Sequence, residues 1–229
     1  MSGTEIGTTI VTGAASGLGR AIAAAVARGG GTPIGFDLNE ATGFDAVQVD
    51  LADTEASESA TRLAIERHGG LDAVVTAAGT DACGPLDGVP SEAWNRVVAV
   101  NLLGTAAVVR AALPALIESR GRVVTIASTL AKRGFPDATA YCASKFGVVG
   151  FTQALAAETA GRVGVTLLSP GGMQTAFFDG REEKYKPPPD AKLASPEEVA
   201  EAVVFALGRP AGVELREALV CPSTESSWP

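Results

Sequence analysis

Histidine is almost absent from this chain, and cysteine, tyrosine and tryptophan are scarce. The 229 residues include one histidine, three cysteines, two tyrosines and two tryptophans. The odd number and wide spacing of Cys83, Cys142 and Cys221 indicate neither a disulfide framework nor a zinc knuckle, and they fit a reducing cytoplasm. His68 falls at the end of an expected helix, where a structural role near the helix dipole is favoured over catalysis. We therefore expect no metal site.

Basic residues and long apolar runs are also few. The chain has 18 lysines and arginines against 26 aspartates and glutamates, which gives a net charge of −8. Nucleic acids and anionic membranes attract the opposite sign of charge. No uninterrupted apolar run reaches the roughly 18 residues that span a bilayer, and the acidic N-terminus leads directly into an apolar strand. We therefore expect a cytoplasmic protein with no secretory signal and with neither nucleic acid nor membrane as a partner.

Short apolar segments alternate with helical stretches along the whole chain. Strands are predicted at Thr8–Val11, Pro33–Phe36, Ala46–Val49, Leu71–Thr76, Arg122–Ile126, Gly164–Leu168 and Ala218–Val220. Helices are predicted at Gly17–Arg28, Thr54–His68, Ser91–Ser119, Tyr141–Ala160 and Ser195–Leu207. Continuous apolar strands are typical of parallel sheets that are covered on both faces. The pattern predicts an α/β fold, a doubly wound parallel sheet (Rossmann fold) of about seven strands in three αβα layers.

No linker or internal repeat divides the chain, so residues 1–229 are expected to form a single Rossmann domain. The composition changes at about residues 172–194, which are rich in glycine, proline and charge. We interpret this segment as a loop or lid over the substrate. Its charged run Arg181–Lys184 is expected to be a solvated face of the loop, and Trp228–Pro229 a packed tail.

A glycine-rich turn follows the first strand in Thr12–Gly19, and a helix follows the turn. Glycine allows the backbone to approach a pyrophosphate, and a helix N-terminus offers free N–H groups, although such turns are common in other settings. Asp37 ends the next strand, about twenty residues on, where a carboxylate binds the adenosine ribose and repels a 2′-phosphate. Because no basic residue stands beside Asp37 or at Ser16, NAD(H) is favoured over NADP(H). A solvated turn acid is the alternative interpretation of Asp37.

Four polar residues form a candidate catalytic group: Asn101, Ser128, Tyr141 and Lys145. Tyr141 and Lys145 are four residues apart in an expected helix and so share a face. A free tyrosine has a pKa of about 10, which is too high for a base at neutral pH, and we expect the lysine to lower it. Ser128 directly follows a strand and suits a role in holding the substrate oxygen. The group fits hydride transfer between an alcohol or ketone and a nicotinamide, with Tyr141 as general acid/base.

These segments resemble the short-chain dehydrogenase/reductase family over nearly the whole chain. The resemblance implies that the four residues are the family's catalytic Asn, Ser, Tyr and Lys. It also implies that Lys145 binds the nicotinamide ribose and that Asn101 orders a water in a proton relay. The family is usually a tetramer or dimer, so a homo-oligomer, a homotetramer or dimer formed through Tyr141–Ala160 and its long neighbouring helix, is expected.

The resemblance further implies a set of cofactor-binding residues. Asp50 and Leu51 match the pair that contacts adenine, and Thr175 matches the threonine that holds the nicotinamide carboxamide. Thr76 and Ala77 replace two asparagines of the family that tie neighbouring strands together. The full expected set is Gly13, Ser16, Gly17, Leu18, Gly19, Asp37, Asp50, Leu51, Ala78, Gly79, Asn101, Tyr141, Lys145, Pro170, Gly171, Met173 and Thr175.

Two other functions stay open from the sequence. One is an NADPH-dependent carbonyl reductase, and the other is a catalytically idle nucleotide-binding regulator. The substrate is expected to be a small alcohol or carbonyl compound that the sequence does not identify further. Cys142 is expected to be a packing residue, whereas Arg133 and Phe135 are left open as neighbours of the substrate.

Overall fold

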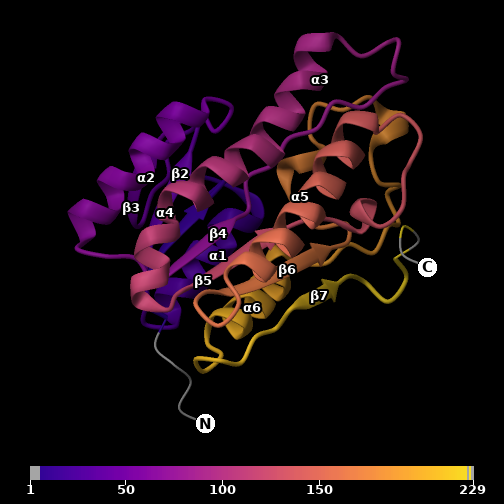
Figure 1. The fold of residues 1–229 in the computed structure, drawn as a ribbon. Helices are drawn as coiled ribbons and strands as arrows, with labels where there is room; N and C mark the ends of the chain where they lie inside the picture. The colour runs from indigo at the N-terminus through magenta and orange to yellow at the C-terminus, as the bar shows by residue number, and fades with distance from the viewer. Residues whose placement is uncertain (1–5, 226, 228–229) are drawn as a thin grey trace.

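A computed structural model of the protein describes residues 6–225 and 227. These residues form a parallel sheet between two layers of helices (Figure 1). Within these residues the sheet has seven strands in the order β3-β2-β1-β4-β5-β6-β7. The predicted doubly wound α/β architecture in three layers is therefore confirmed. Residues 1–5 and the tail Trp228–Pro229, for which the sequence also carried expectations, lie outside the described residues.

Each predicted strand is present, and so are four of the five predicted helices, with ends that shift by at most a few residues. The strands are β1 (Thr8–Thr12), β2 (Thr32–Asp37), β3 (Asp45–Gln48), β4 (Ala73–Thr76), β5 (Arg122–Ile126), β6 (Gly164–Pro170) and β7 (Glu217–Val220). The α-helices are α1 (Gly17–Arg28), α2 (Thr54–His68), α3 (Ser91–Val98), α4 (Thr105–Ser119), α5 (Thr139–Glu158) and α6 (Pro196–Leu207).

Local side-chain signals set the ends of two helices. Asp53 accepts a hydrogen bond from the Ala56 N–H at 2.9 Å and starts α2, which ends at the left-handed Gly69. Ser195 and Glu198 form a reciprocal capping box at the start of α6. His68 is the last residue of α2, as expected, and its ring nitrogen lies 2.8 Å from an Asp45 carboxylate oxygen.

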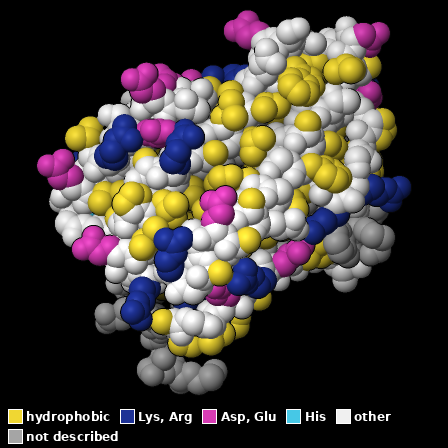
Figure 2. Space-filling model, in the orientation of Figure 1, with side chains coloured by type: hydrophobic (Ala, Val, Ile, Leu, Met, Phe, Trp, Pro, Cys, Tyr) yellow, Lys and Arg dark blue, Asp and Glu magenta, His cyan; other side chains and the backbone are white. Residues whose placement is uncertain are grey.

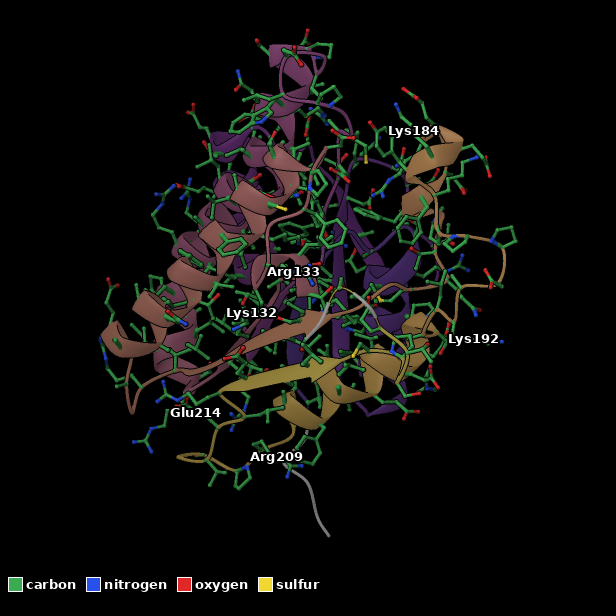
Figure 3. All side chains as sticks on the ribbon, turned by 90° about the vertical axis from the view of Figure 1, so that its right-hand side faces the viewer. Lys132, Arg133, Lys184, Lys192, Arg209 and Glu214 are labelled. Atoms are coloured by element: carbon green, nitrogen blue, oxygen red, sulfur yellow. The ribbon has the colours of Figure 1, made fainter. Side chains whose placement is uncertain are left out.

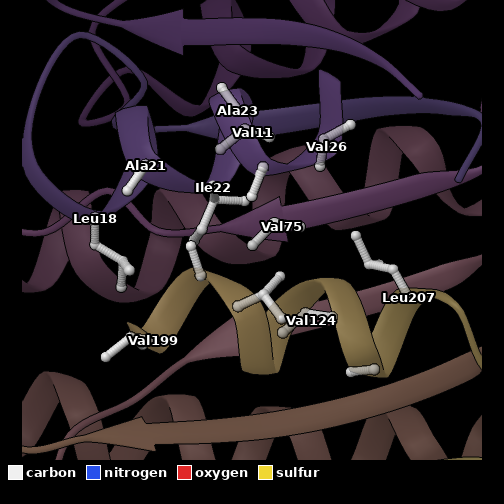
Figure 4. Packing of buried hydrophobic residues seen from close by; sticks show 14 of the residues in the cluster. Val11, Leu18, Ala21, Ile22, Ala23, Val26, Val75, Val124, Val199 and Leu207 are labelled. Carbon is white, nitrogen blue, oxygen red and sulfur yellow. The ribbon is translucent and has the colours of Figure 1, made fainter. Parts of the chain in front are cut away.

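The central strands bury side chains on both faces of the sheet. Val11, Val75 and Val124 pack with α1 and α6 on one face (Figure 4). Ile10, Val74 and Val123, which precede these three valines in their strands, pack with α2, α4 and α5 on the other face. Neighbouring residues of a strand point to opposite faces, so this double burial explains why the strands read as continuous apolar runs.

The helix expected at Ser91–Ser119 is divided into three parts. Between α3 and α4 the chain forms a π-helical turn, η1 (Ala99–Gly104), and Pro114 lies within α4. At Gly104 an added Cβ atom would come within 2.5 Å of the Leu51 carbonyl oxygen, so the turn approaches the chain after β3 very closely. Isolated π-helical turns are rare and occur mostly at functional sites.

Among the described residues, one helical stretch, Ser91–Ser119, is long and apolar enough to cross a membrane by length and composition alone. Of its most apolar 18-residue window, 44% is buried within the protein. Val108, Ala112 and Leu116 are fully buried in the packing against the sheet. The core helix of a globular protein meets the same criterion, so we do not take this stretch as evidence for a membrane span.

The parallel order brings the carboxyl ends of the strands to one edge, toward which the arrowheads point in Figure 1. Asp37 ends β2, Gly13 follows β1, Ala77 follows β4, Ala127 follows β5 and Gly171 follows β6. The direction of winding reverses between β1 and β4, where open α/β sheets form a crevice for ligands. The strand order thus positions the site.

Candidate functional site

The glycines after β1 are required by the backbone. Gly13 and Gly17 have φ angles of 73° and 50°, in the left-handed region that disfavours other residues. A Cβ atom on Gly19 would lie 2.1 Å from the Gly13 carbonyl oxygen, and one on Gly13 would lie 2.8 Å from Ala78 Cα. The turn therefore packs tightly against the start of α1 and against the end of β4. Leu18 points into the core and is buried.

The N-terminus of α1 carries no side-chain cap. Ser16 precedes it in an exposed, extended conformation without a side-chain cap hydrogen bond, and the first turn has no acidic residue. The Thr175 side chain lies 3.3 Å from the position that a Cβ of Gly17 would occupy. The N–H groups of this first turn, with the positive end of the helix dipole, suit an anionic group. The close-packed glycine turn and the uncapped helix fit the pyrophosphate of a dinucleotide.

Asp37 lies against this turn. One of its carboxylate oxygens accepts a hydrogen bond from the Ala15 N–H at 3.0 Å, and the other accepts one from the Asn39 N–H at 2.9 Å. Within residues 6–225 no lysine or arginine forms an ion pair with it. An uncompensated carboxylate therefore stands next to the position expected for the adenosine ribose.

Asp50 and Leu51 follow β3 near the π-helical turn. Asp50 accepts hydrogen bonds from both terminal nitrogens of Arg96 at 3.1 and 3.2 Å and from the Ala52 N–H at 3.0 Å. The Arg96 guanidinium holds the pKa of the Asp50 carboxyl below its usual value. The buried Leu51 packs against Gly104. The adenine contact that the family resemblance implies for this pair stays a prediction.

The segment after β4 links the glycine turn to the catalytic group. The Ala78 N–H donates to Thr12 Oγ1 at 3.0 Å, which joins the ends of β1 and β4. Thr76 Oγ1, at a position where the family has asparagine, is buried with no hydrogen-bond partner among the described residues. A Cβ atom on Gly79 would lie 3.6 Å from Asn101 Oδ1 and 3.7 Å from Lys145 Nζ. Gly79 therefore stands directly beside two of the predicted catalytic residues.

Asn101 lies in the π-helical turn, and its side chain is fully engaged. Its Oδ1 accepts the Thr80 N–H at 2.8 Å, and its Nδ2 donates to the Thr80 carbonyl and to Ser144 Oγ, each at 3.0 Å. The amide thus joins the segment after β4 to helix α5. These bonds make Asn101 a positioning residue, while the proton relay that the resemblance implies for it stays a prediction.

Ser128, Tyr141 and Lys145 lie together at the end of β5. The Ser128 hydroxyl lies close enough to the Tyr141 phenol to lower its pKa, and its Oγ accepts the Leu130 N–H at 3.2 Å. Lys145 Nζ donates to the Ile126 carbonyl at 2.8 Å and lies 5.7 Å from the centroid of the Tyr141 ring. All three side chains are buried, with Tyr141 9% exposed and Lys145 4% exposed.

The expected lowering of the tyrosine pKa is wrong for the chain by itself. Burial raises the pKa of Tyr141 to about 12, against the opposing effect of the Ser128 hydrogen bond. Burial also lowers the pKa of Lys145 to about 8. Lys145 is not among the groups that shift the pKa of the phenol, and its Nζ donates to the Ile126 carbonyl. Desolvation thus moves both pKa values in the direction that favours the uncharged form, although Lys145 remains mainly protonated at neutral pH.

Residues 172–194 form a loop that is closed at its base. Met173 pairs with Ala194 in a parallel bridge, and the Ala194 N–H donates to the Gly172 carbonyl at 3.0 Å. Figure 3 shows Lys184 and Lys192 on the outer side of this loop. On its inner side the Phe177 ring lies 5.7 Å from the Tyr141 ring, centroid to centroid. The loop therefore covers the candidate catalytic group, in the position expected of a lid.

One expectation for this loop is wrong. Arg181 is not solvated, because its side chain is 15% exposed and its Nη2 lies 2.9 Å from an oxygen of Asp81, which is 8% exposed. Glu182, Glu183 and Lys184 are exposed, as expected. The sequence analysis did not single out Asp81. Its position two residues after Gly79 could have indicated that it lies near the site. Its partner Arg181, however, comes from a loop that is distant in the sequence.

The sequence also gave no sign of several other contacts around the site. Trp94 packs in the cluster around Tyr141 and donates to Thr139 Oγ1 at 3.1 Å. Arg133 and Phe135, which had been left open, are both exposed and pair with each other, with the guanidinium 5.8 Å from the ring centroid. Figure 3 marks Arg133 and its neighbour Lys132. Cys142 is buried, in keeping with a packing role.

The C-terminal segment joins two loops of the site. The Gly172 N–H donates to a Glu225 carboxylate oxygen at 2.9 Å, and the Gly171 N–H donates to the Val220 carbonyl at 2.9 Å. Ser227 Oγ donates to Thr129 Oγ1 at 2.7 Å, next to Ser128. Among the described residues no group of three or more His, Cys, Asp or Glu side chains is arranged to hold a metal ion.

The chain matches the short chain dehydrogenase family over residues 7–186. A D-threitol dehydrogenase from Mycolicibacterium smegmatis is 35% identical over 218 residues, which cover 86% of this chain and 84% of the relative. A 2-dehydro-3-deoxy-L-rhamnonate dehydrogenase (NAD(+)) from a Sphingomonas species is 36% identical, with coverage of 74% and 73%. A glycine betaine reductase from Emericella nidulans is 32% identical over 94% of this chain, which spans 19% of that relative's length.

A solved structure supports the same assignment. An alcohol dehydrogenase from the archaeon Thermococcus sibiricus, complexed with 5-hydroxy-NADP, superposes with a TM-score of 0.83 at 26% identity. The match covers 93% of this chain and 95% of that one. The chain therefore belongs to the short-chain dehydrogenase/reductase family, and it is an oxidoreductase that works with a nicotinamide cofactor on small alcohol- or ketone-type substrates.

Proposed function

We propose that this protein is an NAD(H)-dependent dehydrogenase or reductase that interconverts a secondary alcohol and a ketone, with Tyr141 as its general acid/base. The observation that carries the proposal is the buried contact of Tyr141 with Ser128, beside Lys145 and under the Phe177 side of the lid. A buried phenol with a serine hydroxyl beside it is a suitable group to exchange a proton with a substrate oxygen.

The reaction uses each residue for a separate task. A bound nicotinamide supplies the hydride acceptor or donor. In alcohol oxidation Tyr141 takes the hydroxyl proton as the carbon loses its hydride, and in ketone reduction it returns that proton to the oxygen. Ser128 donates a hydrogen bond to the substrate oxygen and stabilises the charge that develops there. The lid excludes water from the reacting groups.

Protonation of Tyr141 favours ketone reduction in this site. Its pKa of about 12 keeps the phenol protonated at neutral pH, ready to donate a proton. Alcohol oxidation needs the phenolate, and a positively charged oxidised nicotinamide nearby would favour that form. We therefore expect ketone reduction to stay fast up to high pH and alcohol oxidation to accelerate as pH rises.

Asp37 supports the choice of NAD(H). Its carboxylate lies beside the glycine turn without a basic partner among the described residues, and it would repel a 2′-phosphate. The Sphingomonas relative is named as an NAD(+) enzyme, whereas the Thermococcus structure holds a derivative of NADP. An NADPH-dependent carbonyl reductase is thus the second candidate. Asp37→Ser should raise the kcat/KM ratio of NADPH to NADH at least tenfold, with Glu40→Ser as a control.

The test is a screen of secondary alcohols and ketones with NAD(H), read by the absorbance of the reduced nicotinamide. On any substrate found, Tyr141→Phe should lower kcat by at least a thousandfold and leave NADH binding intact. A catalytically idle regulator would instead bind NADH and turn over nothing, and Tyr141→Phe would change no property of it. Activity that survives in Tyr141→Phe would refute the proposed role of the phenol.

We also propose that the protein is a homo-oligomer, a tetramer or dimer, whose interface is formed by α5 and the neighbouring helical stretch Ser91–Ser119. Leu103 of that stretch and Phe146 of α5 are 48% and 46% exposed. Hydrophobic side chains are visible along the face in Figure 2. Phe146→Asp should lower the mass measured by light scattering, and a native protein of monomer mass would overturn this assembly.

A further inference from the structure

A buried ion pair beside the reacting phenol takes no part in the mechanism above. Arg181 of the lid and Asp81 of the segment after β4 meet at 2.9 Å, and their side chains are 15% and 8% exposed. Two desolvated charges are costly to bury unless each finds good partners. A lid that needed only to stay closed could use apolar contacts, so the pair invites a different explanation.

Both charges are held in place by their surroundings. The guanidinium carbon of Arg181 lies 4.7 Å from the ring centroids of both Phe177 and Phe178. Asp81 accepts the Ala82 N–H at 2.7 Å and the Cys83 thiol at 3.2 Å. Burial raises the pKa of Cys83 to about 11, so the thiol stays a donor at neutral pH. The pair is therefore ordered before any substrate arrives.

The pair lies within reach of a molecule bound at Tyr141. Phe177, which contacts the Arg181 guanidinium, also packs against the Tyr141 ring. Thr80, the residue before Asp81, is held by Asn101. The charges also act on the phenol, because Asp81 raises the pKa of Tyr141 and Arg181 lowers it. Through Phe177, the ion pair thus lies one aromatic ring away from the phenol of Tyr141.

The chemistry of the pair selects a particular neighbour. A hydroxyl group donates one hydrogen bond and accepts another, so it satisfies a carboxylate and a guanidinium together. A carboxylate on the substrate would be repelled by Asp81, and an ammonium group by Arg181. An alkyl group would cover both charges without offering a hydrogen bond to either.

We propose that Asp81 and Arg181 select substrates that carry a second hydroxyl group next to the carbon that is oxidised, that is, vicinal diols and polyols. This inference rests on the proposed function. The adjacent hydroxyl donates to Asp81 and accepts from Arg181, which orients the carbinol carbon at Tyr141. Such charge-assisted hydrogen bonds contribute about 1.5–3 kcal/mol each, so each partner is expected to account for roughly 10- to 150-fold in kcat/KM.

The experiment compares matched pairs of alcohols with NAD+: 2-butanol with 2,3-butanediol, and cyclohexanol with 1,2-cyclohexanediol. The wild-type protein should prefer the diol of each pair by at least a hundredfold in kcat/KM. Asp81→Asn and Arg181→Met should each lower this diol preference at least tenfold, with NADH binding as the check that the variant is folded. Glu182→Gln, which changes an exposed charge next to Arg181 in the same lid, should keep the preference.

The outcomes separate the two claims. Equal loss of kcat/KM on mono-alcohols and diols in both variants would make the ion pair a structural latch and overturn the proposal. A wild-type enzyme that prefers the mono-alcohol would overturn it as well, while leaving the proposed function intact. Absence of hydride transfer with every alcohol and ketone would overturn the proposed function itself. If Asp81→Asn does not fold, the wild-type preference and Arg181→Met decide the matter.

Discussion

The two ends of the candidate site are built by different means. Around the glycine turn, backbone conformation and missing side chains shape the surface, as at Gly13, Gly17 and Gly19. Around Tyr141, buried polar side chains shape the surface, among them Ser128, Lys145 and the Asp81–Arg181 ion pair. The first end suits a phosphate that approaches the main chain, and the second suits a proton that must be placed on a particular atom.

The difference predicts which kind of substitution damages each end. Where the backbone forms the site, one added methyl group should be harmful and the loss of a side-chain oxygen nearly neutral. Where side chains form the site, the loss of one oxygen or one charge should have the larger effect. Four predictions, each with a matched comparison, test this contrast.

Ser128→Ala should have the largest effect. It removes the hydroxyl that donates to the substrate oxygen in the proposed mechanism, so kcat should fall by about 10²- to 10³-fold. Steady-state rates with NADH and any active ketone measure this. Ser227→Ala, which removes the hydroxyl that contacts the adjacent Thr129, is the control for the position of the loop and should change kcat by less than about threefold. Equal effects of the two would mean that Ser128 only shapes the loop.

Because of Lys145, the free energy of unfolding should change with pH in the alkaline range. Burial lowers its pKa to about 8 from an ordinary value of 10.5, so between these values the unfolded chain binds a proton that the folded chain has lost. The free energy of unfolding should therefore rise across pH 8 to 10.5, by up to about 3 kcal/mol from this group. Urea unfolding of the wild type and of Lys145→Met across this pH range measures the contribution of Lys145. A rise of the same size in both proteins would contradict it.

Gly19→Ala should destabilise the backbone-built end by about 2 kcal/mol, because the new methyl group meets the Gly13 carbonyl and no flexible side chain can move aside. The matched control is Ala24→Gly, which removes one methyl group from the exposed face of the same helix and should cost about 1 kcal/mol. Only Gly19→Ala should also weaken NADH binding, measured by fluorescence titration. Unchanged affinity in Gly19→Ala would show that the cofactor does not use this turn.

Ser195→Ala should have the smallest effect, about 1 kcal/mol of unfolding free energy, because it removes the capping box of α6. Ser16→Ala at the start of the neighbouring α1 should cost only a few tenths of a kcal/mol, since Ser16 makes no side-chain cap. Thermal unfolding of both variants without cofactor compares the two helix ends. A larger loss for Ser16→Ala would contradict the idea that α1 leaves its N-terminus to a ligand.

Sequence reasoning succeeded where the cause of a structure lies within a few residues. The ends of α2 and α6 follow from Asp53, Gly69 and the Ser195 capping box, all local signals. The strands follow from apolar runs whose double burial is common to all parallel sheets of this kind. The i, i+4 spacing of Tyr141 and Lys145 likewise placed both on one face of a helix.

Sequence reasoning failed where a structural feature depends on a contact between segments that are distant in the sequence. The charged run that includes Arg181 reads as solvated, because Asp81, Phe177 and Phe178 come together around it only in the folded chain. The pKa of Tyr141 was expected to fall, because spacing reveals the lysine but not the extent of burial or the Ile126 carbonyl that binds it. The sequence likewise did not indicate the contacts of Glu225 and Ser227 with the site.

The π-helical turn at Ala99–Gly104 also has an evolutionary consequence. A shorter chain without one residue of this turn would let α3 and α4 run together as a regular α-helix, with better backbone hydrogen bonds. The same deletion would rotate one half of the helix relative to the other by about 100°. The Asn101 amide would then swing away from Thr80 and Ser144. Selection for a more stable helix and selection for a working enzyme thus pull this segment in opposite directions.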